Sequence, residues 1–148
     1  MGTRCNVVIN YEETKINLYR HWDGYYSETG YDLAVRLNHS FNKIGNANAE
    51  KFFDSVFNAQ RSVSVHDMDK KQYELTTGEH GDIVYFYEFT FYRNNPKVVG
   101  VVFKHREYAQ GWYTGYEAKI TKENIGSLID WVLQERIQMR QRAAKVAI

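Results

Sequence analysis

Hydrophobic and polar residues alternate along the first part of the chain. Arg4–Tyr11 and Thr14–Tyr19 each place apolar side chains at every second position, which is the period of a half-buried strand. The polar pair Glu12–Glu13 separates the two runs. Two short alternating runs joined by a tight polar turn predict a β-hairpin at the start of the chain.

The period of the pattern changes after a loop predicted at His21–Gly30. One apolar stripe with helical spacing predicts a helix that Gly45 ends, and its members are Leu33, Leu37, Phe41 and Ile44. A second, shorter helix is expected next, with Asn46 or Asn48 as its N-cap. The apolar side of this helix consists of Phe52, Phe53, Val56 and Phe57.

Strand periodicity returns in the second half of the chain. The predicted strands are Ser62–His66, Ile83–Tyr92, Val98–His105 and Trp112–Ile120. Aromatic side chains alternate along Ile83–Tyr92, and a turn at Asn94–Pro96 follows it. Thr121 is expected to cap a last helix, whose apolar stripe is Ile125, Leu128, Ile129, Val132 and Leu133.

These elements together predict an α+β fold. We expect a single domain over residues 1–148, in which an antiparallel sheet of about five or six strands packs with two middle helices and a long C-terminal helix. Residues 136–148 carry the basic side chains Arg136, Arg140, Arg142 and Lys145. Two interpretations of this end are equally open: a solvated tail, or a projecting helix through which the chain forms a homo-oligomer.

Composition narrows the classes of function. The 148 residues contain 19 Lys and Arg against 18 Asp and Glu, a net charge of +1, so a long nucleic acid is not an expected partner. Cys5 is the single cysteine and fits a reducing compartment. The sequence contains neither a signal-peptide pattern nor an apolar run of membrane-span length. We therefore expect a cytoplasmic protein without a membrane partner.

Two predicted loops concentrate polar and aromatic side chains. The first follows the hairpin and the second precedes the aromatic strand, and each holds a histidine two residues from an aspartate. Loops on a rigid scaffold often carry binding residues. The residues predicted to bind a ligand are Arg20, His21, Trp22, Asp23, Tyr25, Thr76, Thr77, Glu79, His80 and Asp82.

Several chemistries are compatible with these loops. His21, Asp23, His80 and Asp82 could hold a metal for hydrolysis, but turn-stabilising hydrogen bonds are the more common role of such residues. Acid–base catalysis by His21 or His80 with Glu79 or Asp82 is a further alternative. The sequence contains no nucleophile elbow, phosphate-binding glycine loop or dinucleotide fingerprint, so we favour a non-enzymatic function without a cofactor.

A small nucleotide is the ligand that the aromatic and basic residues suit best, because rings stack bases and arginines hold phosphates. In the favoured arrangement Trp22 and Tyr25 stack the base, while Arg20 and His80 face phosphate. The hydroxyls of Thr76 and Thr77 and the backbone of the second loop bind the remainder. Other aromatic and basic candidates are Tyr26, Tyr87, Tyr92, Arg93, Lys104, Arg106, Trp112 and Tyr113.

Three short motifs carry a resemblance to a known family. They are Arg4-Cys5-Asn6, the run Tyr19–Tyr25, and Thr76–Ile83 leading into the aromatic strand. In combination they resemble small phage- and prophage-encoded proteins of unassigned function. Tyr26 and Val84 depart from that pattern, where the relatives have proline and glutamate. The resemblance implies a phage protein that acts in the bacterial host cytoplasm and carries no known reaction.

A phage origin implies a particular kind of function. Small phage proteins outside the virion often counteract host defence, which is an inference from setting and not from a site. The leading hypothesis is therefore a non-enzymatic accessory protein that binds and neutralises a defence component, with a small, cyclic nucleotide signal as the favoured ligand. A protein-binding inhibitor of a defence complex, similar in role to anti-CRISPR proteins, and a metal-dependent hydrolase remain alternatives.

Overall fold

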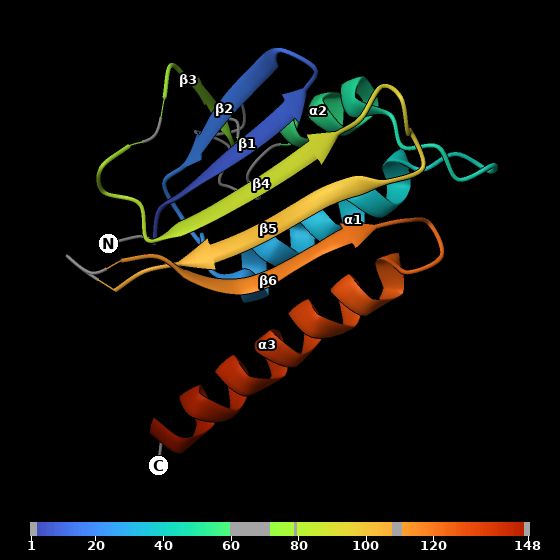
Figure 1. The fold of residues 1–148 in the computed structure, drawn as a ribbon. Helices are drawn as coiled ribbons and strands as arrows, with labels where there is room; N and C mark the ends of the chain where they lie inside the picture. The colour runs from blue at the N-terminus through green and yellow to red at the C-terminus, as the bar shows by residue number, and fades with distance from the viewer. Residues whose placement is uncertain (1–2, 60–71, 79, 108–110, 147–148) are drawn as a thin grey trace.

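The structure is a computed structural model that describes residues 3–59, 72–78, 80–107 and 111–146. Its strands are β1 (Cys5–Tyr11), β2 (Thr14–Arg20), β3 (Glu74–Thr76), β4 (Tyr85–Phe91), β5 (Val99–His105) and β6 (Tyr113–Ile120). Its helices are the π-helical turn η1 (Tyr26–Gly30), α1 (Tyr31–Ser40), α2 (Ala49–Phe57) and α3 (Ile125–Val146). The short strand expected at Ser62–His66 lies outside the described residues. The expected α+β fold with a long C-terminal helix is confirmed (Figure 1).

The sheet has six strands in the order β3-β2-β1-β4-β5-β6. The predicted hairpin pairs Cys5 with Arg20 and Tyr11 with Thr14. The sheet is mostly antiparallel, but its central pair, β1 and β4, runs parallel in register from Cys5–Tyr85. Apolar alternation reveals that a segment is a strand and not which way its neighbour runs, so the sequence could not predict this pair.

The helices cover one face of the sheet (Figure 1). Alternate residues of β4 face them, which confirms the alternation predicted in that strand. Strand β1 is buried on both faces from Cys5 to Ile9, so the half-buried strand predicted there is wrong. Phe52 of α2 is fully buried, with its ring 4.7 Å from Phe89 and 5.6 Å from Phe91. The other fully buried positions of this core include Leu33, Leu37, Val56, Leu128 and Val132. Burial of aromatic and aliphatic side chains at about 1.5–3 kcal/mol each is the main stabilising contribution.

The first helix ends earlier than the apolar stripe predicts. Helix α1 stops at Ser40, and Phe41 adopts an extended backbone with φ −80° and ψ 131°. The Asn42 side chain accepts hydrogen bonds from the backbone N–H groups of Ile44 and Asn46. Such a local turn competes with helix formation, so Ile44 is left 70% exposed.

Side chains bind backbone N–H groups at the start of two helices. Asn48 Oδ1 accepts a hydrogen bond of 2.8 Å from the N–H of Lys51, which confirms Asn48 as the cap of α2. Thr121 Oγ1 accepts from the N–H of Asn124, and Asn124 Oδ1 accepts from the N–H of Thr121. This reciprocal pair stands directly before α3, a helix of 22 residues. No helix in the described part of the chain is both long and apolar enough to cross a bilayer.

The predicted loop His21–Gly30 contains an ordered turn. In η1, the carbonyl of Tyr25 accepts hydrogen bonds from Glu28, Thr29 and Gly30. The Tyr26 ring is buried and lies edge-on to Tyr85. This turn packs against α3 and continues directly into α1, so it belongs to the core and not to a surface loop.

Candidate functional site

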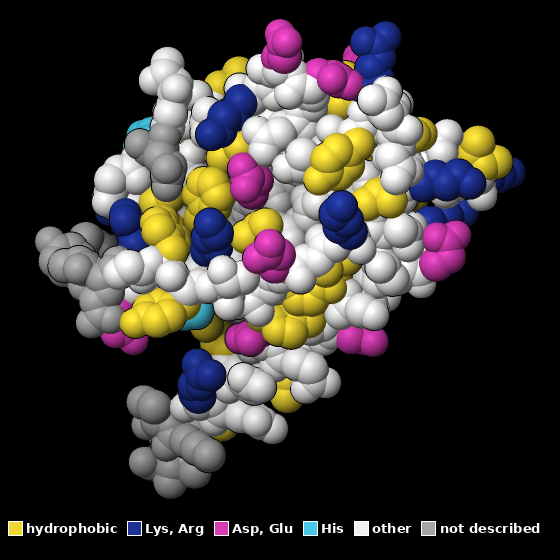
Figure 2. Space-filling view, in the orientation of Figure 1, with side chains coloured by type: hydrophobic (Ala, Val, Ile, Leu, Met, Phe, Trp, Pro, Cys, Tyr) yellow, Lys and Arg dark blue, Asp and Glu magenta, His cyan; other side chains and the backbone are white. Residues whose placement is uncertain are grey.

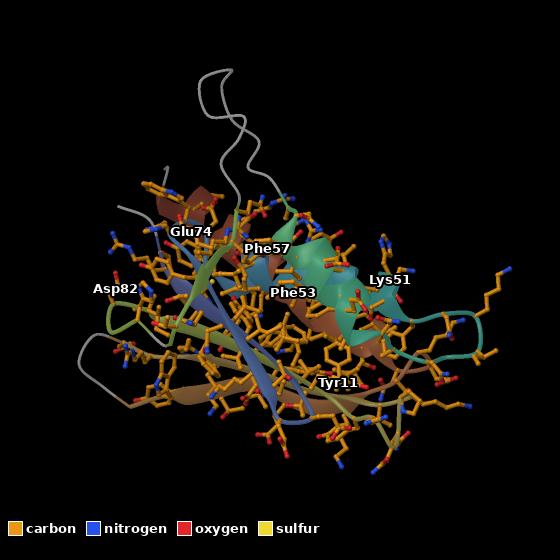
Figure 3. The ribbon with its side chains drawn as sticks, turned by 90° about the horizontal axis from the view of Figure 1, so that it is seen from above. Tyr11, Lys51, Phe53, Phe57, Glu74 and Asp82 are labelled. Carbon is orange, nitrogen blue, oxygen red and sulfur yellow. The ribbon has the colours of Figure 1, made fainter. Side chains whose placement is uncertain are left out.

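The two predicted loops meet in space at one end of the hairpin. Strand β3 pairs with β2 through Leu75–Leu18 and Glu74–Tyr19, and this pairing brings the second loop beside the first. Asp82 and Glu74 lie at this end and Tyr11 at the other (Figure 3). The sequence alone did not show whether the two loops are neighbours.

The residues that meet there form the Tyr19 cluster, which we define as Arg4, Asn6, Tyr19, His21, His80 and Asp82. The Tyr19 ring stacks on His80 at 3.9 Å and lies edge-on to His21 at 4.6 Å. Its hydroxyl donates to the Asp82 carboxylate, with oxygen–oxygen distances of 3.0 and 3.1 Å. Burial and the neighbouring Asp82 carboxylate raise the pKa of Tyr19 to about 12, so the phenol is protonated at neutral pH.

Arg4 and Asn6 connect β1 to this cluster. Arg4 forms an ion pair of 3.4 Å with Asp82, and Asn6 Oδ1 accepts from the backbone N–H of His80. Among the described residues, Arg4 Nε and Asn6 Nδ2 are buried without a hydrogen-bond partner. The cluster therefore joins all three motifs of the resemblance. The sequence analysis gave Tyr19 no functional role, although Tyr19 directly precedes the predicted site residue Arg20.

Arg20 lies on the opposite face of the sheet from His80. Its guanidinium is buried and donates to Thr29 Oγ1 at 2.8 Å and to Tyr73 Oη at 3.3 Å. Arg20 also lines a polar cavity of about 290 Å³ whose other charged residues are Glu28, Asp32 and Arg136. The structure therefore does not bring Arg20 and His80 to one ligand surface.

The remaining predicted site residues are distributed over the first loop and the second. Trp22 is 45% exposed, and Asp23 has a positive φ of 55°. Tyr25 lies edge-on to Tyr85 at 5.8 Å, on the helix side of the sheet. Thr76 Oγ1 is 2.9 Å from His80 Nε2. Thr77 is exposed, and Glu79 lies outside the described residues.

The alternative metal site receives no geometric support. His21 Nε2 lies 3.5 Å from a Glu74 carboxylate oxygen, while His80 stacks on the Tyr19 ring and contacts Thr76. In the described ranges, no three His, Cys, Asp or Glu side chains are grouped so that they could hold a metal ion. Cys5 is fully buried, and burial raises the pKa of its thiol to about 12.

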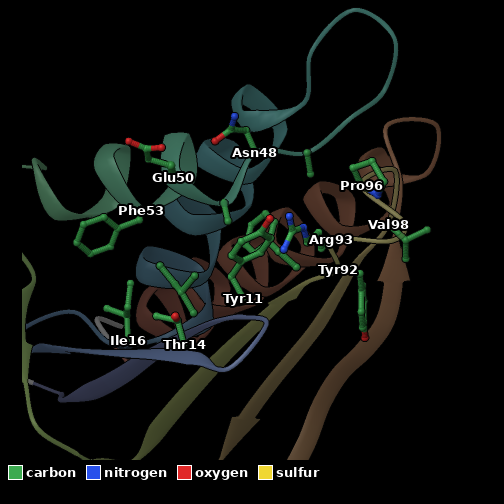
Figure 4. Close-up of a pocket in the computed structure, with 14 residues that line it drawn as sticks. Tyr11, Thr14, Ile16, Asn48, Glu50, Phe53, Tyr92, Arg93, Pro96 and Val98 are labelled. Carbon is green, nitrogen blue, oxygen red and sulfur yellow. The ribbon is translucent and has the colours of Figure 1, made fainter.

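A larger pocket lies at the other end of the hairpin, between the β1–β2 turn, the start of α2 and the turn after β4 (Figure 4). Its volume is about 450 Å³, within the range of about 300–1,000 Å³ typical of small-molecule sites. We call it the hairpin pocket. It is lined by Ile9, Tyr11, Thr14, Ile16, Ala47, Asn48, Ala49, Glu50, Phe53, Phe91, Tyr92, Arg93, Pro96 and Val98.

Three kinds of side chain in the hairpin pocket bear on its chemistry. Tyr11, 41% exposed, and the half-buried Phe53 supply aromatic surface from β1 and α2. Arg93 supplies a cation, and no carboxylate of the described part of the chain forms an ion pair with it. Glu50 is the acidic residue among the lining side chains. The pattern placed Tyr92 and Arg93 among the wider candidates, but it could not indicate that Tyr11 and Phe53 line the same pocket.

The helix-free face of the sheet is mixed in character (Figure 2). Arg106 lies over the Trp112 ring at 4.6 Å, and Lys104 lies 5.9 Å from the Phe86 ring. Glu88 is on the same face and accepts a hydrogen bond from Asn10. Cations, rings and carboxylates thus alternate there, and the described residues of this face form no continuous basic track of the kind a nucleic-acid strand requires.

Comparisons of the chain with family models, with curated proteins and with solved structures find no match.

Proposed function

We propose that this chain is a non-enzymatic binding protein for a small nucleotide, and that the hairpin pocket holds the ligand. The observation that carries the proposal is the combination, in one pocket of about 450 Å³, of aromatic walls and an arginine without an ion-pair partner among the described residues. Rings of this kind stack nucleobases, and an arginine fork binds phosphate through paired hydrogen bonds.

In this arrangement the aromatic side chains of Tyr11 and Phe53 contact the base. Arg93 binds the phosphate at the rim of the pocket, where it is exposed. Asn48 and Thr14 offer an amide and a hydroxyl for the ribose or the base edge. This placement moves the expected ligand from the Tyr19 cluster to the other end of the hairpin, because the cluster's side chains already bind one another.

The biological role in the proposal is neutralisation of a host-defence component by sequestering its nucleotide signal. Its support is the resemblance of the three motifs to phage and prophage proteins. A sequestering protein needs a pocket and no catalytic groups. The groups buried near the first motif serve in hydrogen bonding and packing, and they are the Tyr19 phenol, the Cys5 thiol and the Arg20 guanidinium.

Native mass spectrometry of the protein purified from bacteria, followed by titration calorimetry with cyclic and linear nucleotides, tests the proposal. We expect one nucleotide class to bind and Tyr11→Ala to weaken binding by about 1–3 kcal/mol, the usual contribution of a stacked ring. Arg93→Ala should weaken nucleotides but not the corresponding nucleosides, because it removes only the phosphate contact.

Variants at the sheet's other end are the matched controls. Trp22→Ala removes an exposed aromatic residue from the first loop and should leave nucleotide affinity unchanged. If Trp22→Ala abolishes binding while Tyr11→Ala does not, the ligand binds the predicted loops and the hairpin-pocket assignment is wrong. If no nucleotide binds the folded protein at millimolar concentration, the function itself is refuted.

The second candidate is a protein-binding inhibitor of a defence complex. The observation that favours it is the helix-free sheet face, whose aromatic residues Phe86 and Trp112 are partly exposed beside Lys104 and Arg106. Arginine and aromatic residues are enriched in protein interfaces. A stoichiometric host protein that co-purifies with the chain and is lost in Trp112→Ala, with no small ligand bound, would favour this function over nucleotide binding.

A further inference from the structure

One face of α3 is exposed and has the spacing of a helix-pairing seam. Its members, which we call the α3 seam, are Gly126, Asp130, Leu133, Ile137, Arg140 and Ala144. They follow one another at alternating intervals of four and three residues. This is the heptad spacing that keeps one face of a helix directed towards a second helix.

The α3 seam is separate from the face by which α3 joins the domain. Leu128 and Val132 are fully buried in the core, and the Trp131 ring lies 5.4 Å from Tyr116 of β6. Arg136 is held by the Ser27 carbonyl and lies 4.1 Å from the Tyr31 ring. The helix is therefore fixed to the domain without the seam.

The large apolar side chains at the centre of the seam are exposed. Leu133 is 36% exposed and Ile137 is 47% exposed, and Ile137 lies one helical turn after Leu133. Helix α3 lies at the lower border of the molecule in Figure 1, and the side of it that faces away from the sheet is open. All six seam residues are exposed.

We propose that the occupant of the α3 seam is the same seam of a second copy of this chain, with the two helices antiparallel. The seam is symmetric about residue 135: Leu133 and Ile137 lie at equal distances from it, as do Asp130 and Arg140. A two-fold axis at residue 135 therefore places Leu133 of one copy against Ile137 of the other, twice. Such a contact is the isologous kind that closed dimers use.

Charge determines the direction of the two helices. In the antiparallel pair, Asp130 of one copy faces Arg140 of the other at both ends of the apolar centre. A parallel pair would place Asp130 against Asp130 and Arg140 against Arg140, and like charges across an interface are unfavourable. The charge pattern therefore fits a second copy in one orientation and disfavours the other.

The ends of the seam also suit this register. Gly126 of one copy meets Ala144 of the other, so small residues allow the two helix backbones to approach at both ends. Residue 135 is the middle of Ile125–Val146, and the axis there lets the two helices overlap along their whole length. This dimer gives the basic C-terminal half of α3 an acidic partner, Asp130, in the second copy.

Sedimentation velocity over a concentration series tests the dimer, with the full chain in moderate salt. We expect a reversible monomer–dimer equilibrium. Arg140→Asp should weaken dimerisation by about tenfold or more, because it places two carboxylates together at both ends of the seam. The double variant Asp130→Arg with Arg140→Asp should restore dimerisation, because the opposite charges face each other again with their positions exchanged.

Arg142→Asp is the matched control. It makes the same charge change on the same exposed end of α3, but residue 142 is on a different side of the helix from the seam. We expect the control to dimerise like the unmodified chain. The proposal is overturned if the unmodified chain is monomeric at every concentration, or if Arg140→Asp and Arg142→Asp weaken dimerisation equally. It is also overturned if the double variant Asp130→Arg with Arg140→Asp fails to restore the dimer while circular dichroism shows intact folding.

Discussion

Replacement of Gly115 by alanine should disrupt the contact between β6 and η1. Gly115 is the extra residue at a register shift: Tyr116 pairs with Phe103 and Thr114 pairs with Lys104, which leaves Gly115 unpaired. A Cβ atom at residue 115 would lie 2.5 Å from the hydroxyl oxygen of Tyr26 and 2.7 Å from its Cζ. The bulge therefore exists where a buried tyrosine approaches the strand too closely for a side chain.

The Tyr26 ring cannot move away at low cost. It is enclosed by Tyr85 at 4.8 Å and Trp131 at 4.9 Å, and its hydroxyl is 2.8 Å from His105 Nδ1. Overpacking of a core costs about 1–3 kcal/mol. Loss of the hydroxyl–imidazole hydrogen bond adds about 0.5–1.5 kcal/mol. We therefore expect Gly115→Ala to lower the free energy of unfolding by about 1.5–4.5 kcal/mol.

Urea unfolding followed by circular dichroism measures this loss. Gly81→Ala is the matched control, because a Cβ atom there meets nothing within 4 Å, and its effect should be small. Tyr26→Phe removes the atom nearest to the added methyl group, so the double variant should lose less than the sum of the single variants. A Gly115→Ala protein as stable as Gly81→Ala would refute the packing argument.

Three further predictions concern the core. Phe52→Ala should cost about 3–5 kcal/mol in urea unfolding, because it leaves a cavity beside Phe89, and an unchanged midpoint would contradict the assigned packing. Cys5 should not react with a thiol reagent at pH 8 until urea unfolds the chain, since burial raises its pKa to about 12; rapid reaction in the native state would show that the thiol is accessible. Burial also raises the pKa of Tyr73 and of Tyr87 well above the ordinary value. The free energy of unfolding should therefore be fully retained below the unfolded phenol pKa of about 10 and decline as the pH rises above it. A free energy of unfolding that stays constant up to about pH 12 would contradict this assignment.

Much of the fold follows from local patterns. The alternation of Arg4–Tyr11 and Ile83–Tyr92 predicts strands, and Asn48 marks the start of α2, because a strand face and a helix cap each depend on residues close together in sequence. The predicted end of α1 is wrong, because apolar spacing alone does not show where a side chain interrupts a helix. The stripe from Leu33 to Ile44 continues with helical spacing, but the Asn42 side chain forms a competing turn.

The candidate site was less predictable, because it depends on how distant segments meet. The sequence selected the loops that hold His21 and His80, and the pairing of β3 with β2 brings them together around Tyr19. It also placed Arg20 with His80. In a strand, however, consecutive residues point to opposite faces, so Arg20 points to the helices while Tyr19 points to His80.

The Tyr19 cluster and the proposed ligand site lie at opposite ends of the hairpin. The motifs that carry the resemblance meet in the Tyr19 cluster, where Arg4 and Tyr19 both bind Asp82 and thereby fix the segment after β3 against the sheet. Tyr11, Phe53 and Arg93 of the hairpin pocket lie outside those motifs. A relative with these motifs would therefore have the same Tyr19 cluster, while the ligand that it binds would depend on residues at the other end of the sheet. On this argument, exchanging pocket residues between such relatives should exchange their ligands, whereas exchanging Tyr19-cluster residues should change stability alone.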